Sequence, residues 1–185
     1  PHGQYDGTII FDGKEVQFRS IKDSEALGIG IIHQELALVP YLSIAENIFL
    51  GAEKPRRLGL IDWHEVNHRA EKVLEKVGLK ENVTTQVGTL GVGKQQLIEI
   101  GKALSKDVRL LILDEPTAAL NDNDSAQLLD LVRSLRDEGV AIVIISHKLG
   151  EIVEIADRTT ILRDGQTIET IDMKDPASTQ GKIIS

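Results

Sequence analysis

Short apolar runs alternate with amphipathic stretches along the second half of the chain. Val108–Leu113 and Val140–Ser146 are the two runs, and each predicts a strand that is buried on both faces. Asn121–Glu138 and Lys148–Asp157 follow them with apolar residues at helical spacing. The residues expected to face inward are Leu128, Leu131, Val132 and Leu135 on the first helix and Leu149, Ile152, Val153 and Ala156 on the second. Buried strands that alternate with helices predict a parallel sheet in an α/β fold.

Two Asp-Gly pairs predict hairpins at either end of this pattern. Asp12-Gly13 divides the β-rich residues Gly7–Phe18, and Asp164-Gly165 divides Arg158–Ile171. An Asp-Gly pair between apolar runs is the strongest short-range signal for a hairpin. The run Gly28–Ile32 predicts a further short, buried strand.

Three more helices are predicted in the middle of the chain. The first begins at Ser43, the second is capped by Asp62 and ends at Gly78, and the third follows Gly88–Gly93. A proline and two arginines within Glu53–Gly59 predict a surface loop between the first two. The expected inward residues are Trp63, Val66, Ala70, Val73, Leu74 and Val77 on the second helix and Leu97, Ile100 and Leu104 on the third.

Composition narrows the classes of protein that fit this pattern. The chain has 185 residues and no cysteine, which suits one domain and excludes disulfide scaffolds, cysteine-ligated metals and thiol nucleophiles. Its 21 basic and 29 acidic residues give a net charge of −8, which argues against a nucleic acid partner. No apolar run approaches the roughly 20 residues that cross a bilayer, and no signal peptide is visible. The chain begins without methionine, so we expect it to be a piece of a longer protein.

Two adjacent carboxylates form the densest chemical signal. The apolar strand within Leu110–Pro116 delivers Asp114 and Glu115 at its carboxyl end, the edge at which open α/β sheets bind ligands. Because side chains alternate along a strand, one carboxylate can hold Mg²⁺ while the next points at a water molecule. The alternative is an acidic turn with no chemical role.

A glycine-rich segment precedes that strand. Gly88–Gln95 fits the pattern G-x-x-x-x-G-K, but Gln95 stands where a P-loop needs a Ser or Thr hydroxyl. The polar residues Glu81–Val87 also make a poor buried strand, so we reject the P-loop interpretation. Glycines that open a helix can still donate backbone N–H groups to a phosphate, although they can also be a simple helix cap.

Five motifs resemble those of the ATP-binding subunits of ABC transporters, in the same order and spacing. Gln34 resembles the Q-loop, Leu90–Lys94 the signature loop, Leu110–Pro116 the Walker B strand, Ala118–Asn121 the D-loop and Ser146-His147 the H-loop. The likeness covers essentially the whole chain. It is especially close to bacterial monosaccharide importers of the xylose or multiple-sugar type over the segments His33–Leu36, Ile44–Gly51 and Ile112–Leu120.

The resemblance implies the α/β fold of a P-loop NTPase of the ABC ATPase type, without its N-terminal part and with an inserted helical subdomain. Residues 1–42 would form a β-rich subdomain with the Q-loop, residues 43–106 the helical and signature subdomain, and residues 107–185 the second half of the RecA-like domain. The complete subunit of this family is a tandem of two such domains, and this chain resembles most of the first. The Walker A loop and an adenine-stacking aromatic residue would precede Gly7, so we expect neither in this chain.

The resemblance also assigns roles to individual residues. Gln34 would ligate Mg²⁺ and sense the transmembrane subunits, and Asp114 would position Mg²⁺ through water. Glu115 would be the general base, and His147 would contact the γ-phosphate. The residues implied in binding ATP held by the opposing domain are Leu90, Gly91, Val92, Gly93, Lys94 and Gln95, to which the D-loop adds Asn121. Gly91, Lys94 and Asn121 depart from the usual Ser, Gln and Asp.

The implied function is that of an ATP-binding and ATP-hydrolysing subunit that powers monosaccharide import through an ABC transporter, with ATP and Mg²⁺ as cofactors. Its partners would be transmembrane permease subunits, a second ATP-binding domain and, indirectly, a periplasmic sugar-binding protein. It would lie in the cytoplasm, peripherally on the inner face of the cell membrane. Without a Walker A loop we expect this piece alone to be inactive, and a non-catalytic coupling or regulatory module is the alternative.

Two other protein classes are less consistent with the sequence. His64-Glu65-Val-Asn-His68 matches the H-E-x-x-H zinc protease motif, but the apolar stripe of that helix points away from both histidines, which favours a solvated face. ABC proteins of DNA repair and chromosome organisation carry a long coiled coil, and the stretch from Gln34 to Leu90 has no sustained heptads.

An exposed sheet edge is a further expectation. In the fold that the chain resembles, the Walker A strand lies beside Val140–Ile145. Without that strand, this uncharged run would have unpaired backbone groups, so we expect the chain either to self-associate, by edge pairing or swapping, or to rearrange so that the strand is covered.

Overall fold

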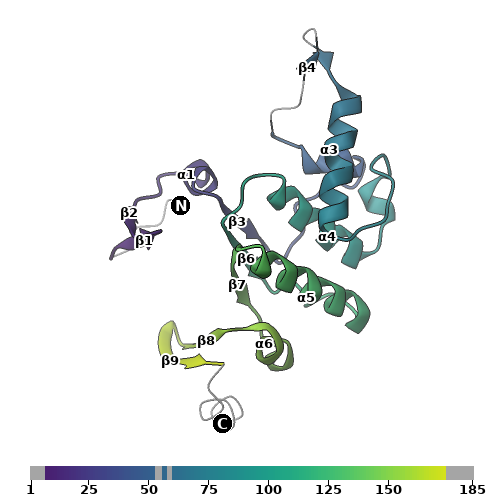
Figure 1. Ribbon diagram of the computed structural model, residues 1–185. Helices are drawn as coiled ribbons and strands as arrows, with labels where there is room; N and C mark the ends of the chain where they lie inside the picture. The colour runs from purple at the N-terminus through teal and green to yellow at the C-terminus, as the bar shows by residue number, and fades with distance from the viewer. Residues whose placement is uncertain (1–6, 53–55, 58–59, 174–185) are drawn as a thin grey trace.

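A three-stranded parallel sheet lies at the centre of the molecule (Figure 1). The computed structural model describes residues 7–52, 56–57 and 60–173. The sheet consists of β3 (Ile29–Ile32), β6 (Leu110–Asp114) and β7 (Ala141–Ile145) in the order β3-β6-β7. Both neighbours pair with β6 in parallel, which confirms the predicted parallel sheet.

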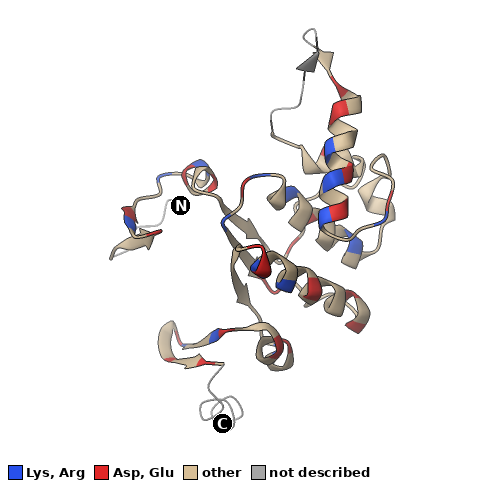
Figure 2. Cartoon of the chain, in the orientation of Figure 1, with Lys and Arg blue, Asp and Glu red and all other residues tan. Residues whose placement is uncertain are grey.

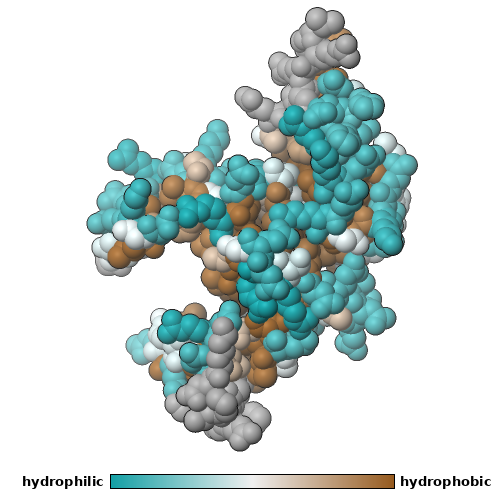
Figure 3. All heavy atoms as spheres, in the orientation of Figure 1, coloured by the Kyte–Doolittle hydropathy of each residue, from teal (hydrophilic) through white to brown (hydrophobic). Residues whose placement is uncertain are grey.

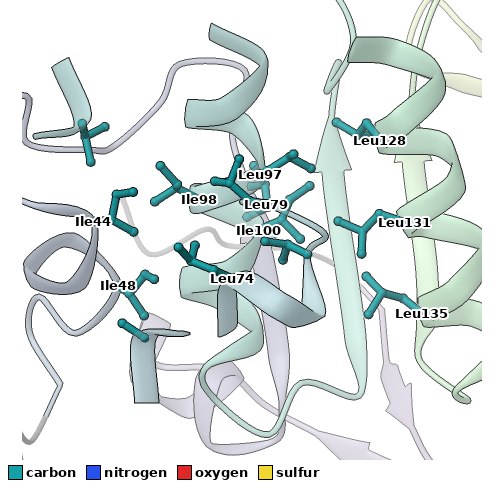
Figure 4. Packing of buried hydrophobic residues seen from close by; sticks show 14 of the residues in the cluster. Ile44, Ile48, Leu74, Leu79, Leu97, Ile98, Ile100, Leu128, Leu131 and Leu135 are labelled. Carbon is teal, nitrogen blue, oxygen red and sulfur yellow. The ribbon is translucent and has the colours of Figure 1, made fainter. Parts of the chain in front are cut away.

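Helix α5 (Asp122–Asp137) connects β6 to β7 and packs on one face of the sheet. Its first turn is capped by Asn121, whose side chain accepts a hydrogen bond from the backbone N–H of Asp124. In Figure 4, its buried leucines point from the helix toward the sheet. The leucines in view on α5 are Leu128, Leu131 and Leu135.

A group of helices is inserted between β3 and β6. It consists of α2 (Ile44–Ile48), α3 (Trp63–Lys76), the 3₁₀ turn η1 (Val87–Thr89) and α4 (Val92–Leu104). The predicted cap Asp62 accepts a backbone hydrogen bond at the start of α3, and Ser43, where a helix was predicted to begin, does the same for α2. Ile44 and Ile98 are fully buried where α2 and α4 pack together, and Ile100 of α4 is fully buried as well (Figure 4). These apolar contacts make the insertion part of the same hydrophobic core as the sheet.

The loop predicted between α2 and α3 contains a small ladder. β4 (Arg56–Arg57) pairs antiparallel with β5 (Leu60–Ile61). The rest of the predicted loop Glu53–Gly59 lies outside the described residues.

Both predicted hairpins are confirmed. β1 (Ile9–Phe11) pairs with β2 (Lys14–Val16), and β8 (Arg158–Arg163) pairs with β9 (Gln166–Asp172). The turn residues at 12–13 and 164–165 all have positive φ, as the Asp-Gly pairs predict. The elements that follow the two strands β2 and β7 are α1 (Ile21–Ala26) and α6 (Leu149–Ile155).

Several residues expected in the core are exposed instead. Val143 and Ile145 of β7 are 47% and 52% exposed, and Ile31 of β3 is also exposed, so these two outer strands are not buried on both faces. The reason is that α5 covers one face only, whereas no described helix packs on the opposite face of β7. Figure 3 shows hydrophobic residues reaching the surface at the middle of the molecule, between the two hairpins.

Two helices also bury less than their patterns predict. Helix α6 has no buried residue, and Leu149 and Val153 are exposed, because its main described neighbour is α5 on one side only. Trp63 begins α3 on its exposed first turn and does not belong to the buried stripe. None of the described helices is long and apolar enough to cross a membrane.

Candidate functional site

Three strands of the parallel sheet end at the same edge, and a polar side chain follows each of them. Gln34 lies two residues after β3, Glu115 directly follows β6, and His147 lies two residues after β7. Because β6 is the middle strand, Glu115 lies between the other two residues. The carboxyl edge of a parallel sheet is the usual place for a ligand site.

Glu115 contacts both of its neighbours through its carboxylate. Gln34 donates a hydrogen bond from Nε2 to Glu115 Oε2 at 3.4 Å, and His147 Nδ1 lies 3.1 Å from Glu115 Oε1. These partners are 81 and 32 positions away from Glu115 in the sequence. The structure therefore brings together three of the residues singled out from the sequence.

The backbone of Glu115 is held in an unusual conformation. Its φ is 45°, in the left-handed region that favours glycine, and its N–H donates to the carbonyl of Ile145 at 2.8 Å. Strained backbone of this kind is found where a structure fixes a functional side chain. Here it turns the carboxylate toward Gln34 and His147 at the end of the strand. With 29% of its side chain exposed, the carboxylate can accept a proton from a water molecule at this edge.

The oxygen atoms near this edge suit a magnesium ion. Asp114 ends β6 beside Glu115, and the Gln34 amide uses its nitrogen to contact Glu115, which leaves its oxygen for another partner. Carboxylate and amide oxygens are the hard ligands that Mg²⁺ prefers, and protein sites usually supply only one or two of them. Asp114 and Gln34 are thus of the chemical types that Mg²⁺ prefers, although the described residues contain no group of three or more His, Cys, Asp or Glu side chains placed to hold a metal ion.

The residues of the proposed signature loop form a second group at the N-terminus of α4. Gly91 is the N-cap of α4, and Gln95 turns back so that its Nε2 donates to the carbonyl of Leu90 at 2.8 Å. The N–H groups of a first helical turn have no partner within the helix and can bind an anion. The 3₁₀ turn η1, not a strand, precedes this helix, which agrees with the rejection of a P-loop here.

This second group contacts the first turn of α5. A Cβ atom added to Gly93 would lie 2.4 Å from Oδ2 of Asp124, so any larger residue would force this side chain of α5 to move. Asn121 caps α5 and also donates from Nδ2 to Asp124 Oδ2 at 2.9 Å. Lys94 points away from this contact and pairs with Glu81 at 2.6 Å. The cation that replaces the usual glutamine is thus already neutralised.

Comparison with known proteins identifies the family to which the chain belongs. A family model described as "ABC transporter" matches residues 2–118. The chain belongs to the ABC transporter family. It is 61% identical over its whole length to the L-arabinose transport ATP-binding protein AraG of Geobacillus stearothermophilus, of which it covers 36%. It is 54% identical over 92% of its length to the xylose import ATP-binding protein XylG of Geobacillus kaustophilus, of which it covers 34%. The chain thus spans about a third of the length of these relatives.

Solved structures of ABC proteins share the fold. A nucleotide-free ATP-binding cassette from an ABC transporter aligns with a TM-score of 0.78 and 22% identity over 95% of this chain and 76% of its own. A dimeric ATP-binding cassette in a post-hydrolysis state bound to ADP and Pi aligns with a TM-score of 0.75 and 22% identity, over 92% and 75% of the two chains. The predicted α/β fold, that of the P-loop NTPases of the ABC ATPase type, is confirmed.

One further group of residues at this site received no role from the sequence. Thr117, two residues after Glu115, donates from Oγ1 to Glu151 Oε2 at 2.6 Å, and its carbonyl accepts from Lys148 Nζ at 2.8 Å. Thr117 lies within Ile112–Leu120, a segment that resembles the sugar importers, but none of these three residues received a role from the sequence. The available signal was weak: Lys148 directly follows His147, and Glu151 lies three residues after Lys148.

The H-E-x-x-H segment of this ABC transporter chain has the solvated environment that its pattern predicts. His64 and His68 are exposed on α3, where acidic and basic residues alternate along the outer face (Figure 2). Glu65 pairs with Arg69 at 2.7 Å, and this hydrogen bond lowers the pKa of the Glu65 carboxyl. A glutamate already committed to an arginine is poorly placed to act as a base for a metal-bound water.

Proposed function

We propose that the full-length polypeptide carrying these residues is an ATP-hydrolysing subunit that powers monosaccharide import through an ABC transporter of the xylose or multiple-sugar type. The observation that carries this proposal is the contact of Glu115 with both Gln34 and His147 at the carboxyl edge of the sheet. The printed functions of the relatives, arabinose transport and xylose import, support the class of sugar.

In the proposed reaction, Glu115 accepts a proton from the water that attacks the γ-phosphorus. The new P–O bond forms as the bond to the leaving ADP breaks, and the proton passes to the Glu115 carboxylate. His147 would contact the γ-phosphate while its ring contacts the Glu115 carboxylate, and so it would keep the phosphate and the base close together. Such positioning supplies most of the catalysis in phosphoryl transfer. Asp114 and Gln34 would hold Mg²⁺, which neutralises phosphate charge when it is bound.

The signature group would serve the nucleotide of an opposing domain. Its N–H groups at the start of α4, a helix of 13 residues, would face the γ-phosphate at the positive end of the helix dipole. Gly91 offers no hydroxyl, and Lys94 is paired with Glu81, so backbone N–H groups would make most of this contact. The residues that we propose for this role are Leu90, Gly91, Val92, Gly93, Lys94, Gln95 and Asn121.

The proposed assembly has this chain as one of two ATP-binding domains on permease subunits at the cytoplasmic face of the inner membrane, with a periplasmic sugar-binding protein acting indirectly. Within the chain we propose a β-rich subdomain with the Q-loop at 1–42, a helical and signature subdomain at 43–106, and the second half of a RecA-like domain at 107–185. The position of α2, α3 and α4 between β3 and β6 supports this division.

The test is the ATP turnover of the full-length polypeptide assembled with its permease in vesicles. Glu115→Gln keeps the shape and removes the base, so we expect ATP binding to persist and turnover to fall by about a hundredfold or more. Glu25→Gln is the matched control, because Glu25 pairs with Lys106 away from the site. Turnover of Glu115→Gln within threefold of the parent would rule out the proposed role of Glu115. It would favour a non-catalytic coupling module.

A further inference from the structure

Three polar residues that all contact one another lie close in the chain to Glu115 and His147. Thr117 is only 2% exposed, and it contacts the first turn of α6 through both its hydroxyl and its carbonyl. The partners are Lys148, the N-cap residue of α6, and Glu151 in its first turn. These two also pair with each other at 3.3 Å, so each member contacts the other two.

These contacts bridge the two segments that carry the reacting side chains. Thr117 follows Glu115 by two residues, and Lys148 directly follows His147. Backbone pairing between the two segments ends where the N–H of Glu115 donates to the carbonyl of Ile145. Beyond that point, Thr117 is joined to Lys148 and Glu151 by side-chain hydrogen bonds.

Little else in the described part of the chain holds His147 in place. Its side chain is 67% exposed, and the helix that follows it buries no residue. Ser146 tightens the turn locally, since its Oγ accepts the N–H of Lys148 at 3.0 Å. An exposed ring on a weakly packed segment needs polar contacts to stay within hydrogen-bond distance of a partner.

We propose that Thr117, Lys148 and Glu151 are positioning residues that hold His147 against Glu115 during ATP hydrolysis. The proposal rests on the function proposed above. Thr117 is the central member, because a single buried residue joins the turn after Glu115 to the segment that begins at His147. The simpler alternative is that these contacts only stabilise α6.

The test compares variants of Thr117 in the full-length polypeptide, with Thr117→Val removing the hydroxyl at constant shape and Thr117→Ser restoring it. For Thr117→Val we expect kcat to fall about tenfold or more, with KM for ATP within twofold of the parent. The amides of residues 147–151 should exchange with deuterium at least tenfold faster. Thr117→Ser should recover kcat to within about threefold.

A matched pair on α6 separates positioning from general stability. Glu151→Ala removes the contact to Thr117, whereas Glu154→Ala, one turn along the same helix, removes the ion pair to Arg133 of α5. We expect the first to lower kcat as Thr117→Val does and the second to leave kcat within twofold. Equal losses in both variants, in step with their melting temperatures, would show that the contacts only stabilise α6 and would overturn the proposal.

The outcomes also separate this proposal from the proposed function. If Glu115→Gln abolishes turnover while Thr117→Val keeps kcat within twofold, the positioning role is wrong and the function stands. If the full-length polypeptide does not hydrolyse ATP, the proposed function fails. Unchanged exchange at residues 147–151 in Thr117→Val would then overturn the contact network as well, whereas faster exchange would support its structural part.

Discussion

Asn47 is the side chain that holds the segment after Gln34 in place. It is fully buried on α2, and its Oδ1 accepts the N–H of Val39 at 2.7 Å. Its Nδ2 donates to the carbonyls of Val39 and Ser43 at 3.0 Å each and lies 3.3 Å from that of Leu42. One side chain thus satisfies the backbone of a loop that has no ladder of its own. We predict that Asn47→Ala destabilises the chain strongly.

The magnitude follows from the groups that lose a partner. Three hydrogen bonds at about 1 kcal/mol each account for about 3 kcal/mol, and the cavity left by removing the amide of the fully buried Asn47 adds about 1 kcal/mol. We therefore expect the free energy of unfolding to fall by about 4 kcal/mol. For a chain of this size, the melting temperature should drop by about 12 °C, at about 3 °C per kcal/mol.

Urea unfolding followed by circular dichroism measures the change, and hydrogen exchange locates it at the Val39 amide. Asn123→Ala is the control, because Asn123 is exposed in the first turn of α5. Its effect should stay within about 0.5 kcal/mol. A loss below 1 kcal/mol in Asn47→Ala, with unchanged exchange at Val39, would refute the reasoning, because the loop would then be held by other contacts.

Three further outcomes are expected. Gly93→Ala should cost about 1–3 kcal/mol in urea unfolding, because its Cβ would meet Asp124 at 2.4 Å, and Asp124→Gly should recover part of that loss. Burial raises the pKa of the Glu99 carboxyl, so the folded chain binds the carboxyl proton more tightly than the unfolded chain does. The free energy of unfolding therefore falls as the pH rises above 4.5, the ordinary pKa of a glutamate. Glu99→Gln should therefore raise the melting temperature more at pH 7 than at pH 4.5. The 185-residue chain should self-associate through β7, and Val143→Lys should lower the molar mass that light scattering measures. A parent chain that is monomeric in light scattering would contradict this.

Local chemistry explains which elements could be predicted from the sequence. The Asp-Gly turns, the caps Ser43, Asp62 and Asn121 and the apolar strand before Asp114 each depend on residues close in the chain. Such signals do not require knowledge of the tertiary structure. They predict the parallel sheet, both hairpins and the helices α2 to α6, whereas α1 was not predicted.

Burial could not be predicted as well, because it depends on which elements meet. Leu149 and Val153 have the spacing of a buried stripe, yet they are exposed because no described element packs on that side of α6. Thr117 gives the opposite case, since an ordinary threonine after a proline becomes a buried link to a helix 34 positions further along. Neither outcome has a signature in the sequence around the residue.

The register of the sheet is what turns separate motifs into a site. Ile32 lies opposite Leu113, so two residues beyond that pair Gln34 reaches the level of Glu115. Asp114 lies opposite Ile145, which brings Glu115 to the level of the residue before His147. Neighbouring strands are about 4.8 Å apart, so side chains from both outer strands can reach a carboxylate on the middle one. A shift of β6 by one residue would exchange the faces of Asp114 and Glu115 and break both contacts. The motifs specify which residues can act, but only the position of β6 between β3 and β7 makes Glu115 their common partner.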